Sequence, residues 1–493
     1  MTDYSDAAEM TATLATPLRT TSIEPGGIEA IAPERRHGSP WQLFATWTAP
    51  NLEFATIFVG VIAVAFFGLG FWEAMLAVVI GTAAGALTQG ILSTWGPREG
   101  LAQMVLSRTA FGYRGNILPA AINTVMAGLG WFAVNSVSGA FALSTLTGMP
   151  VALGLVIVVV IEVAVAFIGH DLVQLFERYA SYILGAIFLV ATITIFLHAD
   201  FGLVQKGGNF SIAGFTLAAG AAFGYAAGWN PYASDYSRYL PASTKSSTIA
   251  WAAGLGNFIS CVVLMAAGAA AATIAGFNPG SPTDSFTATM PTVIRDLTLV
   301  AITIGAIAAN SLNIYSGAMS FLAAGVKIRF TLRRAIIALG FGVVGFFIAL
   351  SAVLNEALSQ DYENFLLVIA YWIAPWLGVV LVDRYLRRGT EIRSIVAESP
   401  RYRNAAGLIA FLLGLVVSVL LFSNQSFFHG LFVAQSLTKT DFNGIGDYTA
   451  IVGLAIAAVS YIVLFRVLKP SLGGSVDAAP AMTAGADASD PAA

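Results

Sequence analysis

The chain has 493 residues, of which 57% are hydrophobic and only 10% are charged. Because soluble domains carry about 25% charged residues, this composition excludes a soluble globular protein and indicates an integral membrane protein. The formal net charge of −3 favours no class of partner, and the single cysteine, Cys261, excludes an internal disulfide.

Long charge-free runs indicate how the chain crosses the membrane. Residues 115–161 form the longest run without Asp, Glu, Lys or Arg, and only the turn-forming residues 147–150 interrupt its apolar character. A transmembrane helix needs roughly 20 apolar residues, so this run contains two helices. Strands of a membrane barrel would alternate in segments of about 10 residues, and the continuous apolar runs exclude them.

We predict an all-α integral membrane protein with twelve transmembrane helices. They are expected at residues 51–71, 73–94, 116–144, 151–168, 180–198, 212–236, 248–275, 296–325, 334–354, 362–383, 405–423 and 448–467. With the N-terminus inside, every one of the 24 basic residues except Lys206, Arg295 and Lys439 falls in a tail or loop on the cytoplasmic side. This asymmetry follows the positive-inside rule, so we expect a multi-pass plasma-membrane protein with both termini in the cytoplasm.

Glycine and proline interrupt the first and the sixth predicted helices. The first has Pro50 at its start and glycines at 60, 68 and 70, and the sixth has glycines at 214, 220, 224 and 228 and Pro231. Interrupted helices at matching positions of two five-helix blocks are typical of inverted-repeat secondary transporters, whose site lies where the helices break. Close packing between helices is the alternative explanation for the glycines.

The third predicted helix carries an aromatic residue and an amide on one face. Trp131 and Asn135 are four residues apart in an apolar segment, so their side chains point the same way. An indole ring with a nearby amide suits a flat heterocycle that is stacked upon and hydrogen-bonded at its edge. The alternative is a tryptophan in helix packing and an asparagine bonded to a neighbouring helix.

Four ordered segments resemble the nucleobase:cation symporter-1 family, and most closely its purine–cytosine permease branch. They are GPREGLAQMVLSRTAFG at 96–112, the GW…N pattern at 130–135, AGWNPYASDYSRYLP at 227–241 and NSLNIYS at 310–316. The similarity extends over residues 47–466. One departure is Leu312, where the branch often has proline.

The resemblance implies a LeuT-type fold of five-plus-five inverted repeats with two additional C-terminal helices. We therefore expect a first repeat at 47–200, a second at 210–384 and the extra helices at 405–467, between disordered cytoplasmic tails at 1–46 and 468–493. It also implies import of a nucleobase by alternating access, driven by a proton or sodium gradient. The branch favours purines and cytosine, whereas other members of the family carry uracil, allantoin, hydantoins or vitamins.

The resemblance also assigns substrate-binding residues. Trp131 and Asn135 match positions that line the substrate, and Asn310 and Asn313 match asparagines that hold the base. An amide ladder between helices is the alternative for the two asparagines of helix eight.

The second aromatic wall of the site is expected in helix six. Trp229, which follows Gly228 at the proposed break, is the first candidate, and Tyr225 and Phe223 are alternatives. A tryptophan of the interfacial aromatic belt is the competing interpretation of Trp229.

Four charged residues are candidates for coupling and gating. Acids inside membrane spans are functional candidates by default, so Glu53 and Glu162 are proton-coupling candidates, with Glu53 ranked first because helix one lines the site in this fold. Asp235 and Arg238 are gate candidates, and a surface ion pair of little energetic value is the alternative.

The side chains of helix eight bear on the identity of the coupling ion. Residues 305–309, directly before Asn310, contain no Ser or Thr, although sodium-coupled relatives tend to supply hydroxyl oxygens there. This departure favours H⁺ over Na⁺. We expect no cofactor, no metal site and no nucleic-acid partner; the partners are a small-molecule nucleobase and the lipid bilayer.

Three rival functions remain open. The first is transport of another heterocycle by the same fold. The second is a membrane-embedded enzyme, which would need clustered acids, histidines or a nucleophile, whereas the four histidines are scattered along the chain. The third is a channel or receptor, which the paired interrupted helices disfavour.

Overall fold

The computed structural model describes residues 27–168, 170–202, 210–326, 328, 333–354, 358–388, 392, 402–437 and 444–470. The outer parts of the two expected disordered tails, residues 1–26 and 471–493, lie outside the described residues. Inside the expected N-terminal tail, the structure has a short 3₁₀ turn at Pro33–Arg35 and a helix that begins at Pro40.

The described chain is almost entirely helical, with one two-residue hairpin. Its elements in chain order are η1 (Pro33–Arg35), α2 (Pro40–Thr48), η2 (Ala49–Asn51), α3 (Phe54–Ala65), α4 (Phe71–Ser93), α5 (Gly96–Glu99), α6 (Gln103–Leu106), α7 (Arg108–Gly115), α8 (Ile117–Val125), η3 (Met126–Trp131), α9 (Phe132–Thr147), α10 (Val151–Ile168), α11 (His170–Phe196), α12 (Ile212–Ala227), η4 (Asn230–Tyr232), α13 (Ala233–Ser237), α14 (Ser246–Ala271), α15 (Pro282–Thr287), α16 (Thr292–Ala323), α17 (Arg333–Leu354), α18 (Leu358–Leu386), α20 (Ala405–Phe422), β1 (Asn424–Gln425), β2 (Phe428–His429), α21 (Leu431–Leu437) and α22 (Thr449–Leu468).

The membrane-spanning helices agree with the predicted set. Within the described residues, ten helices are long and apolar enough to cross a membrane, and a bent helix pair forms a further span. The apolar α10 supplies one more helix of 18 residues, so the structure is consistent with twelve spans.

The first span is broken, but its bounds differ from the prediction of residues 51–71. It begins with α2 at Pro40, bends by 59° and continues as α3 to Ala65. The break lies at Leu52 and Glu53, directly after the proline-containing η2, and not at a glycine. Gly60 instead permits close packing, because a Cβ atom there would lie 1.8 Å from the Met265 carbonyl oxygen of α14. The early start was missed because α2 has a mixed sequence and depends on packing against α14 and α11.

The sixth span is interrupted where the sequence predicts. Helix α12 ends at Ala227, the 3₁₀ turn η4 contains Pro231, and α13 continues the chain to Ser237. Proline cannot donate a backbone hydrogen bond, so the regular helix stops before it.

The third span contains a feature that the sequence pattern does not predict. Between α8 and α9, the segment η3 is π-helical and ends at Trp131. Two glycines in this turn lie close to aromatic rings: Cβ atoms at Gly128 and Gly130 would approach Phe341 and Phe365 within 2.4 and 2.5 Å. Single π-helical turns are frequent at functional sites.

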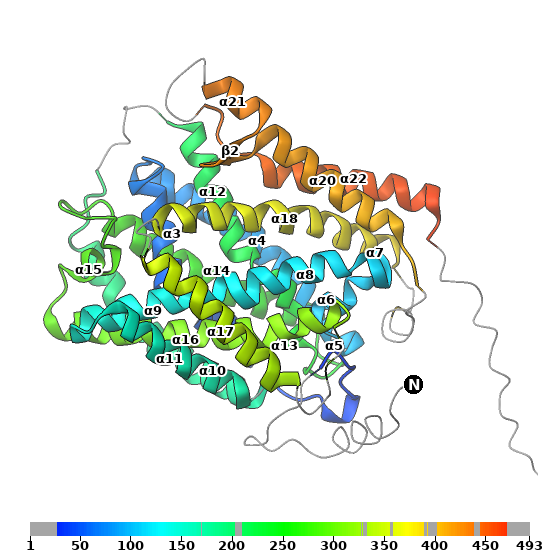
Figure 1. Cartoon of the computed structure of the whole chain (residues 1–493), viewed down its shortest axis with the longest axis horizontal. Coiled ribbons are helices and arrows are strands. Elements are labelled where there is room, and N and C mark those ends of the chain that lie inside the picture. The colour runs from blue at the N-terminus through cyan, green and yellow to red at the C-terminus, as the bar shows by residue number, and fades with distance from the viewer. Residues whose placement is uncertain are drawn as a thin grey trace, which may run out of the picture.

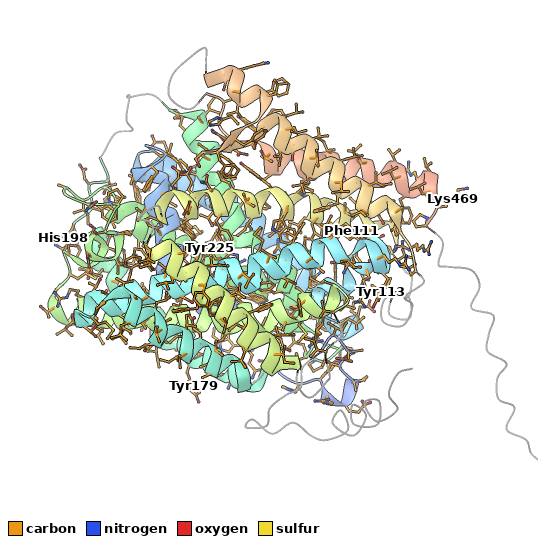
Figure 2. All side chains as sticks on the ribbon, in the orientation of Figure 1. Phe111, Tyr113, Tyr179, His198, Tyr225 and Lys469 are labelled. Carbon is orange, nitrogen blue, oxygen red and sulfur yellow. The ribbon has the colours of Figure 1, made fainter. Side chains whose placement is uncertain are left out.

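The packing of the helices places the interrupted spans in the middle of the bundle (Figure 1). The C-terminal helices α20 and α22 lie side by side along one edge and pack on α18. Along the opposite edge, α10 contacts α9, α16 and α17. Figure 2 shows Tyr225 of α12 in the interior, between His198 at one end of the molecule and Lys469 at the other.

Candidate functional site

An aromatic cluster surrounds the C-terminal end of the π-helical turn. The Trp131 ring makes edge-to-face contacts with Tyr225, at a centroid distance of 5.2 Å, and with Phe365, at 5.1 Å. Tyr362 of α18 lies 6.4 Å away in the same type of contact. Trp131 is only 6% exposed, so helices three, six and ten enclose it in this conformation.

The aromatic residue opposite Trp131 is Tyr225, one of the two alternatives to Trp229. Trp229 lies 6.1 Å from Trp47 and 5.7 Å from Tyr232, and its indole nitrogen donates a 2.8 Å hydrogen bond to the Asn51 side chain. These contacts join helix six to the break in helix one. Trp229 is buried, which contradicts the alternative of an interfacial belt residue. Gly228 lies beside Trp131, because a Cβ atom there would lie 3.2 Å from the indole nitrogen.

The three predicted asparagines form one network. Asn135 and Asn313 each donate to the side-chain oxygen of Asn310, at 3.1 and 3.2 Å. Asn310 in turn donates to the Phe132 carbonyl oxygen at 2.9 Å and to Ser136 Oγ at 3.1 Å. All of these amides are buried, and each takes part in hydrogen bonds, as polar groups buried in an apolar span must.

One acceptor in this network is unused. Among the described residues, Asn135 Oδ1 is buried and has no hydrogen-bond partner. A buried amide oxygen without a partner costs about 1–3 kcal/mol, so a ligand donor that reaches it would recover that energy. Because Asn135 lies one helical turn after Trp131, the open acceptor and the aromatic cluster are neighbours.

Glu53 caps the second half of the broken helix. Its Oε2 accepts a 2.8 Å hydrogen bond from the Ala55 backbone, and its Oε1 accepts a 3.0 Å hydrogen bond from the Tyr225 hydroxyl. Thr56 Oγ1 lies 2.5 Å from the same hydroxyl. A carboxylate at the N-terminus of a helix complements both the free N–H groups and the helix dipole. Glu53 therefore fixes the break and joins helix one to helix six.

Glu162 lies on α10 and is also fully buried. It contacts the amide network at Ser136. Its Oε2 lies 2.6 Å from Ser136 Oγ, the hydroxyl to which Asn310 donates. Its Oε1 is buried and has no hydrogen-bond partner within the part of the chain that the structure describes.

Asp235 and Arg238 are buried, so the alternative of a surface ion pair is wrong. Asp235 accepts from the backbone of Gln103 at 2.8 Å. Arg238 donates to the carbonyl oxygens of Gly27 and Glu29 at 3.2 and 3.3 Å, and to the Tyr315 hydroxyl at 3.3 Å. The arginine thus ties the segment before α2 to helices six and eight.

The hydroxyl groups of helix eight are engaged with backbone oxygens. Thr303 Oγ1 donates to the Leu299 carbonyl at 3.1 Å, and Ser311 Oγ donates to the Ile307 carbonyl at 2.8 Å. Where helix eight meets the helix-one break, it presents Gly305, whose hydrogen faces the Leu52 carbonyl: a Cβ atom there would lie 2.2 Å from that oxygen.

Sequence reasoning missed Phe365, Tyr362 and Ser136. Phe365 and Tyr362 lie in an apolar helix rich in aromatics, where the sequence gives no sign of which ring faces Trp131. Ser136 adjoins Asn135 in a charge-free span, and a run of two polar residues there was an available signal.

Comparison with known proteins agrees with these observations. The profile of the family described as "Permease for cytosine/purines, uracil, thiamine, allantoin" matches residues 30–442. YxlA of Bacillus subtilis, a purine-cytosine permease by name, is 31% identical over 459 residues, which cover 91% of this chain and 97% of YxlA. The purine-cytosine permease fcyB of Emericella nidulans is 30% identical over 464 residues, covering 90% and 88% of the two chains.

Two solved structures show the same fold. Mhp1, a nucleobase-cation-symport-1 family transporter in a closed conformation with bromovinylhydantoin bound, superposes with a TM-score of 0.70 at 18% identity, covering 93% of this chain and 98% of that one. A Na⁺-coupled sialic acid symporter superposes with a TM-score of 0.64 at 13% identity, covering 94% and 96%.

The broken first span and these superpositions define a multi-pass membrane protein with a LeuT-type fold of two five-helix repeats and two additional helices. The chain belongs to the family of permeases for cytosine/purines, uracil, thiamine and allantoin, within nucleobase:cation symporter-1 and on its purine–cytosine permease branch. Its relatives are transporters and not enzymes, as predicted.

Proposed function

We propose that this protein is a proton-coupled importer of nucleobases, with cytosine and purines as substrates. It works by alternating access in the plasma membrane, with both termini in the cytoplasm. The names of the relatives and the description of the family support the substrate class. The distribution of basic residues supports the orientation.

The observation that carries this proposal is the open acceptor beside the aromatic cluster. Cytosine and adenine are flat rings that carry N–H donors on one edge. In our proposal the ring stacks on Trp131 and an N–H group donates to Asn135 Oδ1, the buried oxygen without a partner among the described residues. Stacking of a base on an aromatic side chain contributes roughly 1–3 kcal/mol.

The remaining predicted residues complete the pocket around the base. Tyr225 forms the opposite wall and separates from Trp131 when the substrate enters. Asn310 and Asn313 orient the Asn135 amide through the hydrogen bonds to Asn310 Oδ1. Trp229 stabilises the helix-one break through Asn51, and therefore acts on the pocket from outside it.

The surroundings of the helix-one break support coupling to protons. A sodium site requires several oxygen ligands at short distance. At the contact between helices one and eight, the helix-eight residue is Gly305, and the hydroxyls of Thr303 and Ser311 are bonded to backbone carbonyls. At this contact Gly305 supplies no side-chain oxygen, and the hydroxyls of Thr303 and Ser311 are directed at carbonyls of their own helix.

A thermal-shift panel on the purified protein tests the proposal. Cytosine, adenine, guanine, hypoxanthine, uracil, allantoin and thiamine are compared with and without sodium. We expect cytosine or a purine to raise the unfolding temperature equally in both buffers, because a bound ligand stabilises only the folded state. A shift that appears only with sodium would contradict proton coupling.

The second candidate function is transport of another heterocycle. The family description includes uracil, thiamine and allantoin, and the structurally similar Mhp1 holds a hydantoin. In the same panel, stabilisation by one of these compounds, with no shift from cytosine or any purine, would establish this alternative in place of the proposed substrates.

A further inference from the structure

Glu162 is an isolated acid in an apolar part of the bundle. It is the only ionisable residue of α10 and is fully buried. Helix α10 packs against α9, α16, α17 and α11. A carboxyl group in such a place destabilises the fold. An acid inside a membrane span is therefore a candidate for a functional role.

Among the described residues, no ionisable side chain of the neighbouring helices forms an ion pair with it. Helix α9 has none, and those of α17 are confined to its first two positions, whose side chains lie outside the described residues. On α16, Arg295 and Asp296 are bonded to each other about 22 Å along the helix from Asn310, and the Tyr315 hydroxyl is bonded to Tyr239.

On α11, Tyr179 and Tyr182 are exposed at the surface of the bundle, and Arg178 is partly buried. The side chains of the ionisable residues at the start of α11, residues 170, 171 and 177, are outside the described set. The polar groups beside Glu162 within the described residues are therefore Ser136 of α9, at 2.6 Å, and Asn310 of α16.

The protons around Ser136 can be placed in two ways that satisfy its hydrogen bonds. Ser136 Oγ lies 2.8 Å from the Phe132 carbonyl, 2.6 Å from Glu162 Oε2 and 3.1 Å from the Asn310 amide nitrogen. The carbonyl only accepts and the amide nitrogen only donates, so the single hydroxyl proton points either to Phe132 or to Glu162. If it points to Phe132, the contact with Glu162 is a hydrogen bond only when Glu162 carries a proton.

The two arrangements share the same heavy-atom positions and differ by one proton. In the protonated arrangement, Glu162 donates to Ser136 and Ser136 donates to Phe132. In the ionised arrangement, Ser136 donates to Glu162, and the Phe132 carbonyl keeps its 2.9 Å hydrogen bond from Asn310. The ionised carboxylate then has a buried Oε1 with no partner among the described residues, which is costly in an apolar interior.

We propose that Glu162 is the proton-binding residue of the symport cycle and that Ser136 and Asn310 link it to the substrate amides. The inference rests on the proposed function and identifies the site of its coupling ion. Loss of the proton leaves Glu162 Oε1 in need of a donor, which this packed conformation does not offer within the described residues. Deprotonation therefore favours a conformation in which water or another group reaches Oε1, and this conformational preference couples the proton to transport.

Glu53, favoured as the coupling residue because helix one lines the site in this fold, is assigned a structural role in this proposal. Both of its carboxyl oxygens accept hydrogen bonds that hold the helix break together, from Ala55 and Tyr225. Replacing Glu53 would therefore remove hydrogen bonds that hold helices one and six together.

The test measures cytosine affinity from pH 5 to pH 8 on purified wild type, Glu162→Gln and the control Glu73→Gln, whose side chain is at the start of α4. Glutamine at 162 retains a donor toward Ser136 and so resembles the protonated form. We expect the affinity of wild type and of the control to fall as the pH rises, and that of Glu162→Gln to stay at the wild-type low-pH value. In proteoliposomes, Glu162→Gln is expected to lose at least tenfold of proton-driven accumulation and to retain cytosine exchange.

A second variant leaves the acid in place. Ser136→Ala removes the hydroxyl that is hydrogen-bonded to both Glu162 and Asn310, so we expect its cytosine affinity to depend less on pH than that of wild type. If Glu162→Gln keeps the wild-type pH dependence, or still accumulates cytosine on a proton gradient, the assignment to Glu162 is wrong although the proposed function stands. If Glu162→Gln does not fold, wild-type pH dependence in Ser136→Ala overturns the proposal. If wild type binds no nucleobase, it is the proposed function that fails.

Discussion

Two of the buried carboxyl groups, those of Glu53 and Glu162, differ in how completely they are hydrogen-bonded. Glu53 lies at the break of helix one, and each of its oxygens accepts a hydrogen bond from a neighbouring group. Glu162 lies within a continuous helix, and one of its oxygens has no partner in the described part of the chain. The Glu53 carboxyl holds helices one and six together, whereas burial of the incompletely hydrogen-bonded Glu162 carboxyl destabilises the fold.

This difference in hydrogen bonding helps to assign a role to each of the two carboxyl groups. Proximity to the expected site favours Glu53, because helix one lines the site in this fold. Hydrogen-bond partners favour Glu162, because its neighbours among the described residues, Ser136 and Asn310, belong to the amide network. Stability measurements and transport measurements should therefore respond to the two residues in opposite ways.

The largest effect on stability is expected from Glu53→Ala. Loss of the helix cap costs about 0.5–2 kcal/mol, and loss of the hydrogen bond from Tyr225, whose hydroxyl keeps its contact with Thr56, costs about 0.5–1.5 kcal/mol. The free energy of unfolding in detergent should fall by about 1–3.5 kcal/mol. Glu162→Gln is the matched comparison and should leave it unchanged within about 1 kcal/mol. Equal losses in the two variants would remove the distinction between the two acids.

Trp131→Ala tests the aromatic half of the site. It removes the ring on which the base is expected to stack, so the affinity for the substrate should fall by about 1–3 kcal/mol, or roughly 5- to 150-fold. Saturable uptake of [³H]cytosine should disappear while surface expression is retained. The control is Trp72→Ala, a tryptophan that is 68% exposed at the periphery. Normal uptake in Trp131→Ala would exclude the stacking arrangement.

Asn135→Ala tests the amide half and should have the smallest effect. The variant removes the open acceptor and one donor to Asn310, which keeps its hydrogen bond from Asn313. A single hydrogen bond contributes about 0.5–1.5 kcal/mol, so binding should weaken about 2- to 12-fold. A competition assay with Asn278→Ala as the control measures this loss. Unchanged affinity would show that the substrate does not use Asn135.

Much of this arrangement can be predicted from the sequence because it depends on local pattern. The apolar runs and the basic residues define the spans. The spacing of Trp131 and Asn135 places them on one helix face, and the structure has them in adjoining clusters around Tyr225 and Asn310. Pro231 also predicts the interruption of helix six.

The rest depends on contacts between distant segments. Helix α2 is stabilised by packing on α14 and α11, so its own sequence does not reveal it as half of a span. The choice of Tyr225 over Trp229 follows from the rotation of helix six relative to Asn51 and Trp131. A serine in an apolar helix ordinarily bonds to the preceding turn, as Ser136 does to Phe132, and the sequence cannot show its additional contact with Glu162.

The central claim is that this chain imports a nucleobase with protons. The most direct measurement is uptake of radiolabelled cytosine and adenine into proteoliposomes of the purified protein under an inward proton gradient, in sodium-free buffer. The account predicts accumulation above the external concentration that a protonophore abolishes and that sodium does not alter. Accumulation that survives the protonophore and vanishes without sodium would contradict it.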